Sequence, residues 1–314
     1  MLVKEKYLVS VIMPVFNAAK YIERAVESVI HLPATGELIL IEDDSQDNSY
    51  QICIAIQCKY ANVRILKHFD GKNHGAAASR NLGISNAKYL YISFLDADDC
   101  YLNNRFDVEA HIFKQFPQID GVYGATIANF ESVKAKDLFA LTNINELTTF
   151  TDIVAPENLF KALILGGYGC FHTSGITVKK KLLEKSGGFN SSIRYVEDTE
   201  LWYKLSLLGK IVAGNISEPV SMRWVHENNS IHESEKIKPF RKLMYQHIFN
   251  WAIKNSFSFE VKNLLFMSIH RYANECKFSP FQLLLSLVRN NPSFVVSSFF
   301  IKKLHLIILK KGNK

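Results

Sequence analysis

Short apolar runs alternate with stretches of helical periodicity along the first hundred residues, and this alternation limits the possible folds more than any other feature. The apolar runs that read as buried strands lie at 8–16, 37–45, 62–68 and 88–99. Helical stretches separate them, at 19–31, 48–60 and 75–86. Strands that alternate with helices at this spacing are typical of a parallel sheet covered on both faces. The sequence therefore predicts an α/β fold.

Polar residues gather where three of these strands end. The clusters are PVFN at 14–17, EDDS at 42–45 and DADD at 96–99. One acidic turn after a strand is usually a solvated loop or a helix cap. Ligands of parallel sheets bind at the carboxyl ends of the strands, so three clusters at one edge predict a binding site.

The third cluster crowds Asp96, Asp98 and Asp99 into four positions. Carboxylates this close together repel one another and resist ionising at the same time. A compensating cation, or a partner rich in hydrogen-bond donors, is the natural explanation for such a turn.

The pattern is looser after Asn104. We expect helices at 104–116 and 156–165, a strand at 121–130, and a loop at 131–155, where no firm periodicity is present. A Gly-rich turn, a strand and a short helix should follow, the helix being stopped by Gly187 and Gly188. The last elements expected before the charge pattern changes are a helix at 199–209 and a strand at 219–226.

Charge is distributed unevenly along the chain. The whole sequence has a net charge of +7, yet residues 236–314 contain 14 Lys and Arg and only two Asp and Glu. The rest of the chain is acidic on balance, so a change of role near residue 235 is expected.

Composition disfavours several classes of protein. The five cysteines have neither CxxC spacing nor zinc-type spacing with histidine, which favours thiols in a reducing cytosol. The first apolar run contains Pro14 and lacks a small-residue cleavage site, so a strand is expected there rather than a secretion signal. No apolar run reaches the roughly 18 residues that cross a membrane. We expect a soluble or peripheral, cytoplasmic protein.

Several motifs occur together, in order, in a way that resembles the family-2 glycosyltransferases. They lie within residues 8–230 and read VSVIMPVFN, LILIEDDSQDNS, HGAAASRNLGIS, LDADD, SGGF and VEDTEL. The resemblance implies a GT-A type nucleotide-sugar-binding fold with a mainly parallel central sheet and a C-terminal helical extension. It divides the chain into a nucleotide-sugar-binding half at 1–103, an acceptor-binding half of the same domain at 104–235, and a basic helical extension at 236–314.

The resemblance also explains the crowded carboxylates. When the sugar of a nucleotide-diphospho-sugar is transferred, the negatively charged nucleoside diphosphate departs. Mn²⁺ or Mg²⁺ held by oxygen ligands would neutralise the charge of this leaving group. By resemblance, Asp98 is a direct metal ligand, Asp96 reaches metal-bound water or the ribose, and His226 lies near the metal or diphosphate. A lone histidine is more often structural, which is the alternative for His226. Asp99 could be a third member of the site, but we expect a helix cap.

The resemblance places the nucleotide against the first two clusters. Pro14, Phe16 and Asn17 would lie against the base, although Phe16 could instead be a core aromatic. Asp43 matches the position that accepts a hydrogen bond from the base imide, which suits uracil. Its neighbour Glu42 departs from the usual Asp of the family, and we assign it to the same nucleotide site.

Arg80, in SRN, falls on the helix before the metal-binding strand. A permanently charged, forked guanidinium suits contact with the base or the diphosphate. The alternative is a simple ion pair with a surface acid.

VEDTEL supplies the candidate catalytic base. By resemblance, Asp198 removes the proton of the acceptor hydroxyl, with Glu197 as its orienting or acceptor-binding neighbour. The alternative for Asp198 is an N-cap of the helix that follows. We expect His172, Thr173 and Ser174 to border the acceptor pocket.

The basic extension should contain helices near 238–256, 260–275 and 280–290, followed by an apolar and basic segment at 293–311. Lysines among Phe, Ile and Leu suit a helix that lies in an anionic headgroup layer, on the inner face of the cytoplasmic membrane. Equally, the apolar side could pack on the catalytic domain or a second subunit. No nucleic-acid-binding module accompanies the charge.

We therefore expect an inverting, divalent-metal-dependent hexosyl- or N-acetylhexosaminyltransferase. Its donor would be a nucleotide sugar, with UDP expected from Asp43, and its acceptor a hydroxyl of a surface polysaccharide or lipopolysaccharide precursor. The alternative is a non-catalytic sugar-nucleotide-binding protein of the same fold. A phosphoacceptor signalling domain and an aspartyl-phosphate phosphatase fit less well, because both place their acidic motif on or near the first strand.

Overall fold

The computed structural model describes residues 6–142, 144–166, 169–227, 229, 234–275 and 289. The chain divides into two compact units, Met1–Glu235 and Lys236–Lys314. The first unit carries every predicted site residue.

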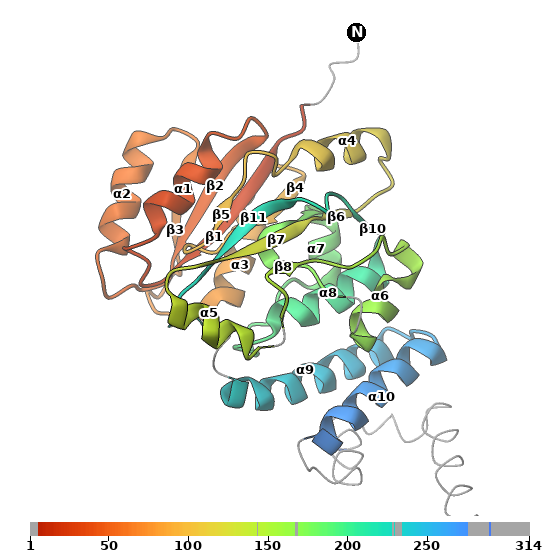
Figure 1. Ribbon diagram of the computed structural model, residues 1–314. Helices are drawn as coiled ribbons and strands as arrows, with labels where there is room; N and C mark the ends of the chain where they lie inside the picture. Colours follow the sequence, from red (N-terminus) through yellow and green to blue (C-terminus); the bar gives the residue numbers. More distant parts are fainter. Residues whose placement is uncertain are drawn as a thin grey trace, which may run out of the picture. The chain divides into compact units, whose positions relative to one another are not determined.

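In the described part of the chain, the central sheet has seven strands in the order β10-β6-β9-β4-β1-β2-β3 (Figure 1). Their bounds are β1 Val9–Val15, β2 Thr35–Glu42, β3 Val63–Lys67, β4 Tyr91–Phe94, β6 Gly121–Tyr123, β9 Ile176–Lys179 and β10 Ile211–Ala213. Strands β1 to β4 run parallel, as do β6 and β10, while β9 runs antiparallel to both β4 and β6. The predicted α/β fold with a mainly parallel central sheet is confirmed.

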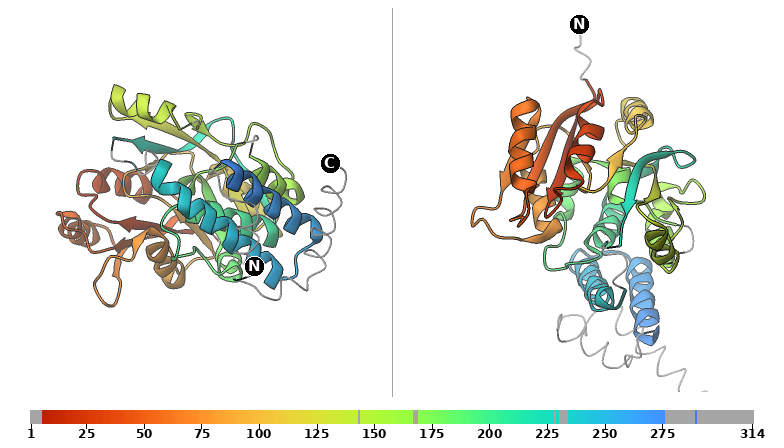
Figure 2. Two further views of the ribbon diagram at one scale, coloured as in Figure 1. Left: turned by 90° about the horizontal axis from the view of Figure 1, so that it is seen from below. Right: turned by 60° about the vertical axis from the view of Figure 1, so that its left-hand side comes forward.

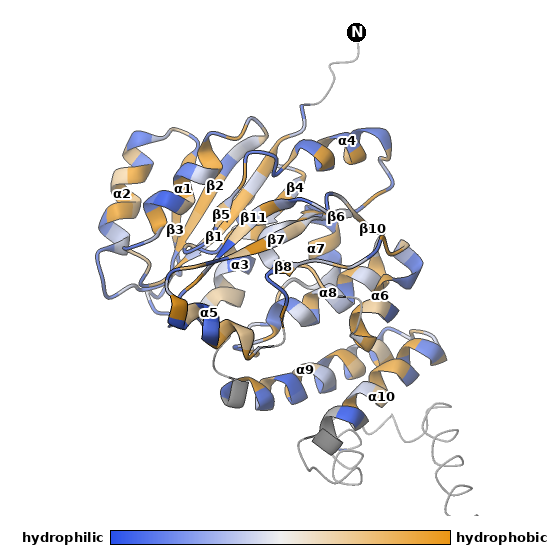
Figure 3. Cartoon of the chain, in the orientation of Figure 1, coloured by the Kyte–Doolittle hydropathy of each residue, from blue (hydrophilic) through white to orange (hydrophobic). Residues whose placement is uncertain are grey.

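Helices cover both faces of this sheet because alternate side chains of a strand point to opposite faces. Val11 and Met13 of β1 belong to a buried cluster with residues of α1 and α2, whereas Ile12 belongs to a cluster with residues of α3, α7 and α8. Figure 3 shows the apolar colour concentrated on the strands and on the covered sides of these helices. The bounds are α1 Ile22–Ile30, α2 Ser49–Lys59, α3 Gly75–Asn86, α7 Lys180–Ser186 and α8 Glu197–Leu208.

A smaller sheet has the strand order β5-β11-β7-β8, and Figure 2 shows both sheets from further sides. Its bounds are β5 Cys100–Tyr101, β7 Ala125–Phe130, β8 Leu147–Thr148 and β11 Pro219–Val225. The single strand predicted at 121–130 is therefore wrong, because β6 and β7 belong to different sheets. The chain changes sheets at Gly124, where a Cβ atom would lie 2.8 Å from Val220.

The loop expected at 131–155 is also wrong in part. Helix α5, Val133–Ala140, and strand β8 form there. Ser132 caps the helix by accepting a hydrogen bond from the backbone N–H of Ala135, and Phe139 is buried. A serine cap followed by a short apolar face was the available signal for this helix. Helices α4, Asp107–Gln115, and α6, Pro156–Leu165, lie where they were expected.

In the second unit, the described elements are α9, Ser234–Lys254, and α10, Phe259–Glu275. They match the first two helices expected in the basic extension. The helix expected at 280–290 and the segment at 293–311 lie outside the described residues, apart from Arg289. Among the helices that the structure describes, none has both the length and the apolar character of a membrane span.

Candidate active site

The predicted site residues meet at one edge of the central sheet. The parallel strands β1, β2 and β4 all end at this edge, so the segments after Val15, Glu42 and Phe94 emerge together. Strand β9 is antiparallel to β4 and therefore begins there, preceded by the short 3₁₀ helix η1, Thr173–Gly175. The topology thus adds His172, which lies just before η1, to the same edge.

Two loops at this edge are tied together through Asn17. Its side-chain oxygen accepts a hydrogen bond from the backbone N–H of Gln46 at 2.8 Å, and its own backbone N–H donates to Ser45 Oγ at 3.1 Å. The side chain of Phe16 next to it is 49% exposed, so it is not a core aromatic. Pro14 is half-buried on β1. The contact of these residues with a base stays a prediction.

Glu42 and Asp43 are buried and already have partners. Glu42 accepts a hydrogen bond from the backbone N–H of Ser45 at 2.6 Å and pairs with Lys67 Nζ at 2.9 Å. The two carboxylate oxygens of Asp43 accept the backbone N–H groups of His74 and Gly75, each at 2.8 Å. Asp43 thereby anchors the start of α3. Each oxygen keeps a further lone pair, so its contact with a base imide stays a prediction.

Asp99 is not a helix cap, because strand β5 follows it directly. Its buried side chain accepts a hydrogen bond from the backbone N–H of Trp224 at 2.9 Å. Burial, together with the charges of Asp98 and Asp96, raises the pKa of Asp99 well above its ordinary value. The turn therefore concentrates more negative charge than its own residues neutralise.

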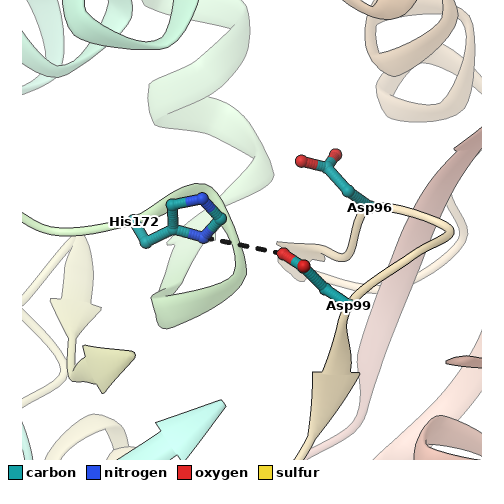
Figure 4. Close-up of side chains that lie close together, drawn as sticks. All are labelled: Asp96, Asp99 and His172. Atoms are coloured by element: carbon teal, nitrogen blue, oxygen red, sulfur yellow. Dashed lines mark ion pairs between the residues drawn. The ribbon is translucent and has the colours of Figure 1, made fainter. Parts of the chain in front are cut away.

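His172 completes a cluster with two of these carboxylates. Ligand atoms of Asp96, Asp99 and His172 all lie within 4.8 Å of one another, and Figure 4 shows the three side chains converging. His172 Nδ1 is 3.9 Å from Asp99 Oδ2. Burial, with the charge of Arg223, lowers the pKa of His172 to about 3. The imidazole is therefore neutral, the form in which histidine binds metals.

Asp98 and His226 form a second group beside the first, with Asp98 on the acidic turn and His226 just after β11. His226 Nε2 is 3.3 Å from Asp98 Oδ2, and Asn229 Nδ2 lies 3.4 Å from the same oxygen. The His226 ring stacks on Tyr21 at a centroid distance of 5.3 Å. The structure thus brings together two residues, one after β4 and one after β11, that were predicted to serve one metal.

Arg80 joins the acidic turn to the helix that carries the candidate base. Its buried guanidinium donates to Asp96 Oδ1 at 2.7 Å and to Glu197 Oε1 at 2.8 Å. Burial lowers the pKa of Arg80, but the charges of Asp96 and Glu197 outweigh burial and raise it. The predicted contact of Arg80 with the donor stays a prediction. What the geometry shows is a link between two carboxylates of the site.

Asp198 lies in the first turn of α8 and is not its N-cap, which is Val196. The carboxylate accepts hydrogen bonds from Thr199, at 2.6 Å from the backbone N–H and 3.2 Å from Oγ1. Burial raises the pKa of the adjacent Glu197 to about 7, although Arg80 opposes this. Asp198 is half-buried and lies next in sequence to Glu197, whose pair with Arg80 fixes the start of the helix.

The SGGF segment holds α3 and α8 together. Asn81 of α3 donates from Nδ2 to Phe189 O at 2.8 Å and accepts from the Phe189 N–H at 2.9 Å. This close approach requires Gly188, whose φ is +69° and whose added Cβ would lie 2.5 Å from Asn81 Oδ1. Asn190 then donates to Glu200 of α8 at 3.0 Å. Hydrogen bonds thus connect the segments that carry the SRN, SGGF and VED motifs.

The donor set fits a hard divalent cation. Three carboxylates and two imidazoles surround the turn, and oxygen-rich sets of this kind suit Mg²⁺ or Mn²⁺ better than soft metals. Sequence reasoning favoured a helix cap for Asp99, with a place in the site as the alternative, and expected His172 at the acceptor pocket. No local signal marked His172, because its place beside the acidic turn follows from the antiparallel direction of β9, which begins at this edge.

Comparisons with known proteins agree with this geometry. Residues 10–155 match the model of the Glycosyl transferase family 2. A relative described as an uncharacterized glycosyltransferase of Haemophilus influenzae is 38% identical over 161 residues, which cover 48% of this chain and 64% of the relative. The minor teichoic acid biosynthesis protein GgaA of Bacillus subtilis is 29% identical over 208 residues, covering 64% of this chain and 44% of GgaA.

The fold is also found among solved structures. The crystal structure of S. aureus TarS 1–349 in complex with UDP-GlcNAc aligns with a TM-score of 0.64 and 16% identity, covering 94% of this chain and 79% of TarS 1–349. The chain spans less than two thirds of the length of the curated relatives it matches. Residues 10–155 are thus similar to glycosyltransferase family 2, and the chain has the GT-A fold.

Proposed function

We propose that the protein is an inverting, metal-dependent glycosyltransferase that moves a sugar from a UDP-sugar to an acceptor hydroxyl. The observation that carries this proposal is the Arg80 bridge. It connects Asp96, on the turn that would hold a cation, with Glu197, next to the candidate base. A protein that only bound a nucleotide sugar would have no need to couple the donor turn to an acceptor-side carboxylate.

The residues divide the chemistry among themselves. Asp98, with Asp96 and His226, would hold Mn²⁺ or Mg²⁺, and Asp99 and His172 complete the set. When bound, the cation would neutralise the diphosphate that departs. Asp198 takes the proton of the acceptor hydroxyl as its oxygen attacks the anomeric carbon. The bond from that carbon to the diphosphate breaks, its electron pair stays on the phosphate oxygen, and one displacement inverts the configuration.

The donor and acceptor classes rest on less direct support. UDP is favoured by the position of Asp43 and by the UDP-GlcNAc bound in the structure of TarS. GgaA is named as a teichoic acid biosynthesis protein, which favours a cell-surface polymer or a lipopolysaccharide precursor as the acceptor. The sugar would be a hexose or an N-acetylhexosamine.

The decisive experiment measures UDP release from a panel of UDP-sugars by the full-length chain. We expect slow hydrolysis of at least one donor with Mn²⁺, and its loss with EDTA or in the Asp98→Asn variant. Asp44→Asn is the matched control, because Asp44 belongs to the neighbouring cluster and has no assigned role. Binding of UDP without release from any donor would favour a non-catalytic sugar-nucleotide-binding protein instead.

We also propose that the basic extension docks on an anionic membrane surface, where a lipid-linked acceptor would be found. Its charge supports this, with 14 Lys and Arg in residues 236–314. Flotation with vesicles that contain anionic lipid should carry the full-length chain, and high salt should release it. Replacing Lys302 and Lys303 by Glu should weaken flotation. Equal flotation with neutral vesicles would contradict electrostatic docking.

A further inference from the structure

Arg223 is a cation of the site edge that none of the predicted functions uses. It lies on β11, is half-buried, and pairs through its backbone with Ala128 of β7. Among the residues that the structure describes, its guanidinium makes no hydrogen bond and no ion pair. A half-buried arginine without such a partner is unusual, because its five N–H donors lose water contacts.

Strand β11 carries Arg223 next to the acidic turn, because the following residue, Trp224, donates its backbone N–H to Asp99. Side chains alternate along a strand, so Arg223 shares a face with Ser221, whose hydroxyl bonds Thr126 Oγ1 at 2.7 Å. Trp224 lies on the other face, with the Arg24 guanidinium 3.9 Å from its ring centroid. The backbone N–H of Trp224 meanwhile holds Asp99. The strand therefore connects the acidic turn directly to Arg223.

The charge of Arg223 acts on the groups of that turn. Burial has the largest influence on the pKa values of Asp96, Asp99 and His172, and the charge of Arg223 lowers all three. Burial also raises the pKa of Cys170 to about 11, again opposed by Arg223. The guanidinium is thus close enough to act on these groups but contacts none of them directly.

Three other arginines near this edge already have hydrogen-bond or ion-pair partners. Arg80 bridges two carboxylates, and Arg105 is fully buried with bonds to Glu109 Oε1 at 2.5 Å and Ser174 O at 3.0 Å. Arg24 donates to the backbone oxygen of Asp98 at 2.8 Å. Among these four arginines, Arg223 alone has no hydrogen bond or ion pair within the described part of the chain.

We propose that Arg223 binds the β-phosphate of the donor and is a catalytic residue for departure of the leaving group; this rests on the proposed function. As the acceptor oxygen bonds the anomeric carbon, the bond from that carbon to the β-phosphate oxygen breaks. The electron pair stays on that oxygen. Arg223 donates N–H hydrogen bonds to the phosphate and remains protonated throughout, since an arginine does not lose its proton in proteins.

The test compares binding of UDP and UMP, which differ by the β-phosphate alone. Calorimetry with Mn²⁺ would be run on the full-length wild type, Arg223→Gln, Arg223→Lys and Lys114→Gln. We expect Arg223→Gln to weaken UDP binding by about 10- to 100-fold, the usual effect of losing a charge-assisted hydrogen bond. UMP binding should change far less. Arg223→Lys keeps the positive charge but lacks the forked N–H donors of a guanidinium. Its UDP affinity should therefore lie between those of the wild type and Arg223→Gln.

Lys114→Gln removes one positive charge from an exposed position of α4 and should leave both affinities unchanged. Thermal unfolding without ligand checks that each variant folds. Hydrolysis of the donor without acceptor should slow in Arg223→Gln in parallel with UDP affinity.

Unchanged UDP affinity and unchanged hydrolysis in Arg223→Gln would overturn the proposal, as would an effect confined to the KM of the acceptor. Equal losses for UDP and UMP would also overturn it, because the β-phosphate would then not be the group contacted. If the wild type binds no UDP at all, the proposed function itself fails. The two failures are therefore distinguishable.

Discussion

The acidic clusters after β2 and β4 look alike in the sequence but differ in what their carboxylates contact. After β2, Glu42 pairs with Lys67, and Asp43 receives two backbone N–H groups at the start of α3. After β4, Asp96, Asp98 and Asp99 face one another and two imidazoles, with Arg80 as their direct cationic partner among the described residues. The first cluster is satisfied by the fold, whereas the second leaves negative charge that a ligand must neutralise.

This difference shows that clusters of the same residue types can serve stability or chemistry. Carboxylates whose oxygens are filled by backbone N–H groups hold loops in place. Carboxylates that crowd together with few donors store electrostatic repulsion, which a divalent cation relieves. Substitutions in the first cluster should therefore change the free energy of unfolding, and substitutions around the second should change turnover.

The largest expected effect is on turnover, from Asp198→Asn. The amide oxygen can still accept the hydrogen bond from Thr199, so the start of α8 should keep its structure. Loss of a general base typically costs about 10²- to 10⁴-fold in rate. Steady-state kinetics should show this fall in kcat with UDP affinity unchanged. A kcat within about threefold of the wild type would exclude Asp198 as the base.

Arg80→Met should lower both the free energy of unfolding and the turnover, because Arg80 connects the acidic turn with the helix that carries the candidate base. Breaking a buried pair leaves Asp96 and Glu197 unpaired and typically costs about 3–5 kcal/mol of unfolding free energy. Activity should fall as well, since Asp96 loses its partner. Chemical denaturation and UDP release would be measured on the same samples. Arg64→Met, which removes a less buried arginine paired with Glu37, is the control for stability. A stable but inactive Arg80→Met would sharpen its role toward the donor.

Asp43→Asn should mainly reduce stability. An amide has one acceptor oxygen, so it cannot receive the N–H groups of both His74 and Gly75, and a lost charged hydrogen bond costs about 1.5–3 kcal/mol. Asp44→Asn is the matched control. Asp44 has a φ of +62°, which asparagine also tolerates, so a change within about 0.5 kcal/mol is expected. Denaturation midpoints would separate the two. If Asp43→Asn is as stable as its control, the anchoring role is wrong.

The smallest effect concerns the pH dependence of stability at Glu42. Burial raises its pKa, but the Ser45 N–H and Lys67 outweigh burial, and the pKa is lowered overall. A lowered pKa means that ionised Glu42 stabilises the fold above the unfolded-state pKa, and that this contribution is lost as pH falls through the folded-state pKa. Glu42→Gln should therefore show a weaker loss of unfolding free energy in acid than the wild type. If the free energy of unfolding falls equally with decreasing pH in Glu42→Gln and in the wild type, this prediction is wrong.

Local patterns predicted most of the first hundred residues, because strands and helices there are regular and their ends carry strong signals. The predicted and observed bounds of α3 coincide at Gly75 and Asn86. The prediction failed where partners far apart in the sequence decide the structure. Strand β5 is two residues long and exists because β11 pairs with it, and the division at Gly124 depends on which sheet each half joins.

Site residues followed the same rule. Asp98 and His226 were predicted together and lie 3.3 Å apart. For Asp99 a helix cap was favoured over a place in the site, and His172 was expected at the acceptor pocket, because the proximity of the two residues depends on β9 running antiparallel beside β4. Arg223 carries no motif signal, and its role follows only from the groups on which its charge acts and from the partners that it lacks among the described residues. Long-range pairing thus determined what the sequence patterns could not reveal.

The central claim is that the acidic turn seats a divalent cation that the nucleotide diphosphate requires. The most direct test titrates UDP into metal-stripped protein with and without Mn²⁺, for the wild type and Asp98→Asn. We predict that Mn²⁺ increases the affinity of the wild type by at least about tenfold and leaves that of Asp98→Asn nearly unchanged, since metal-ligand loss commonly costs this much or more. Equal affinities with and without Mn²⁺ in the wild type would contradict the claim.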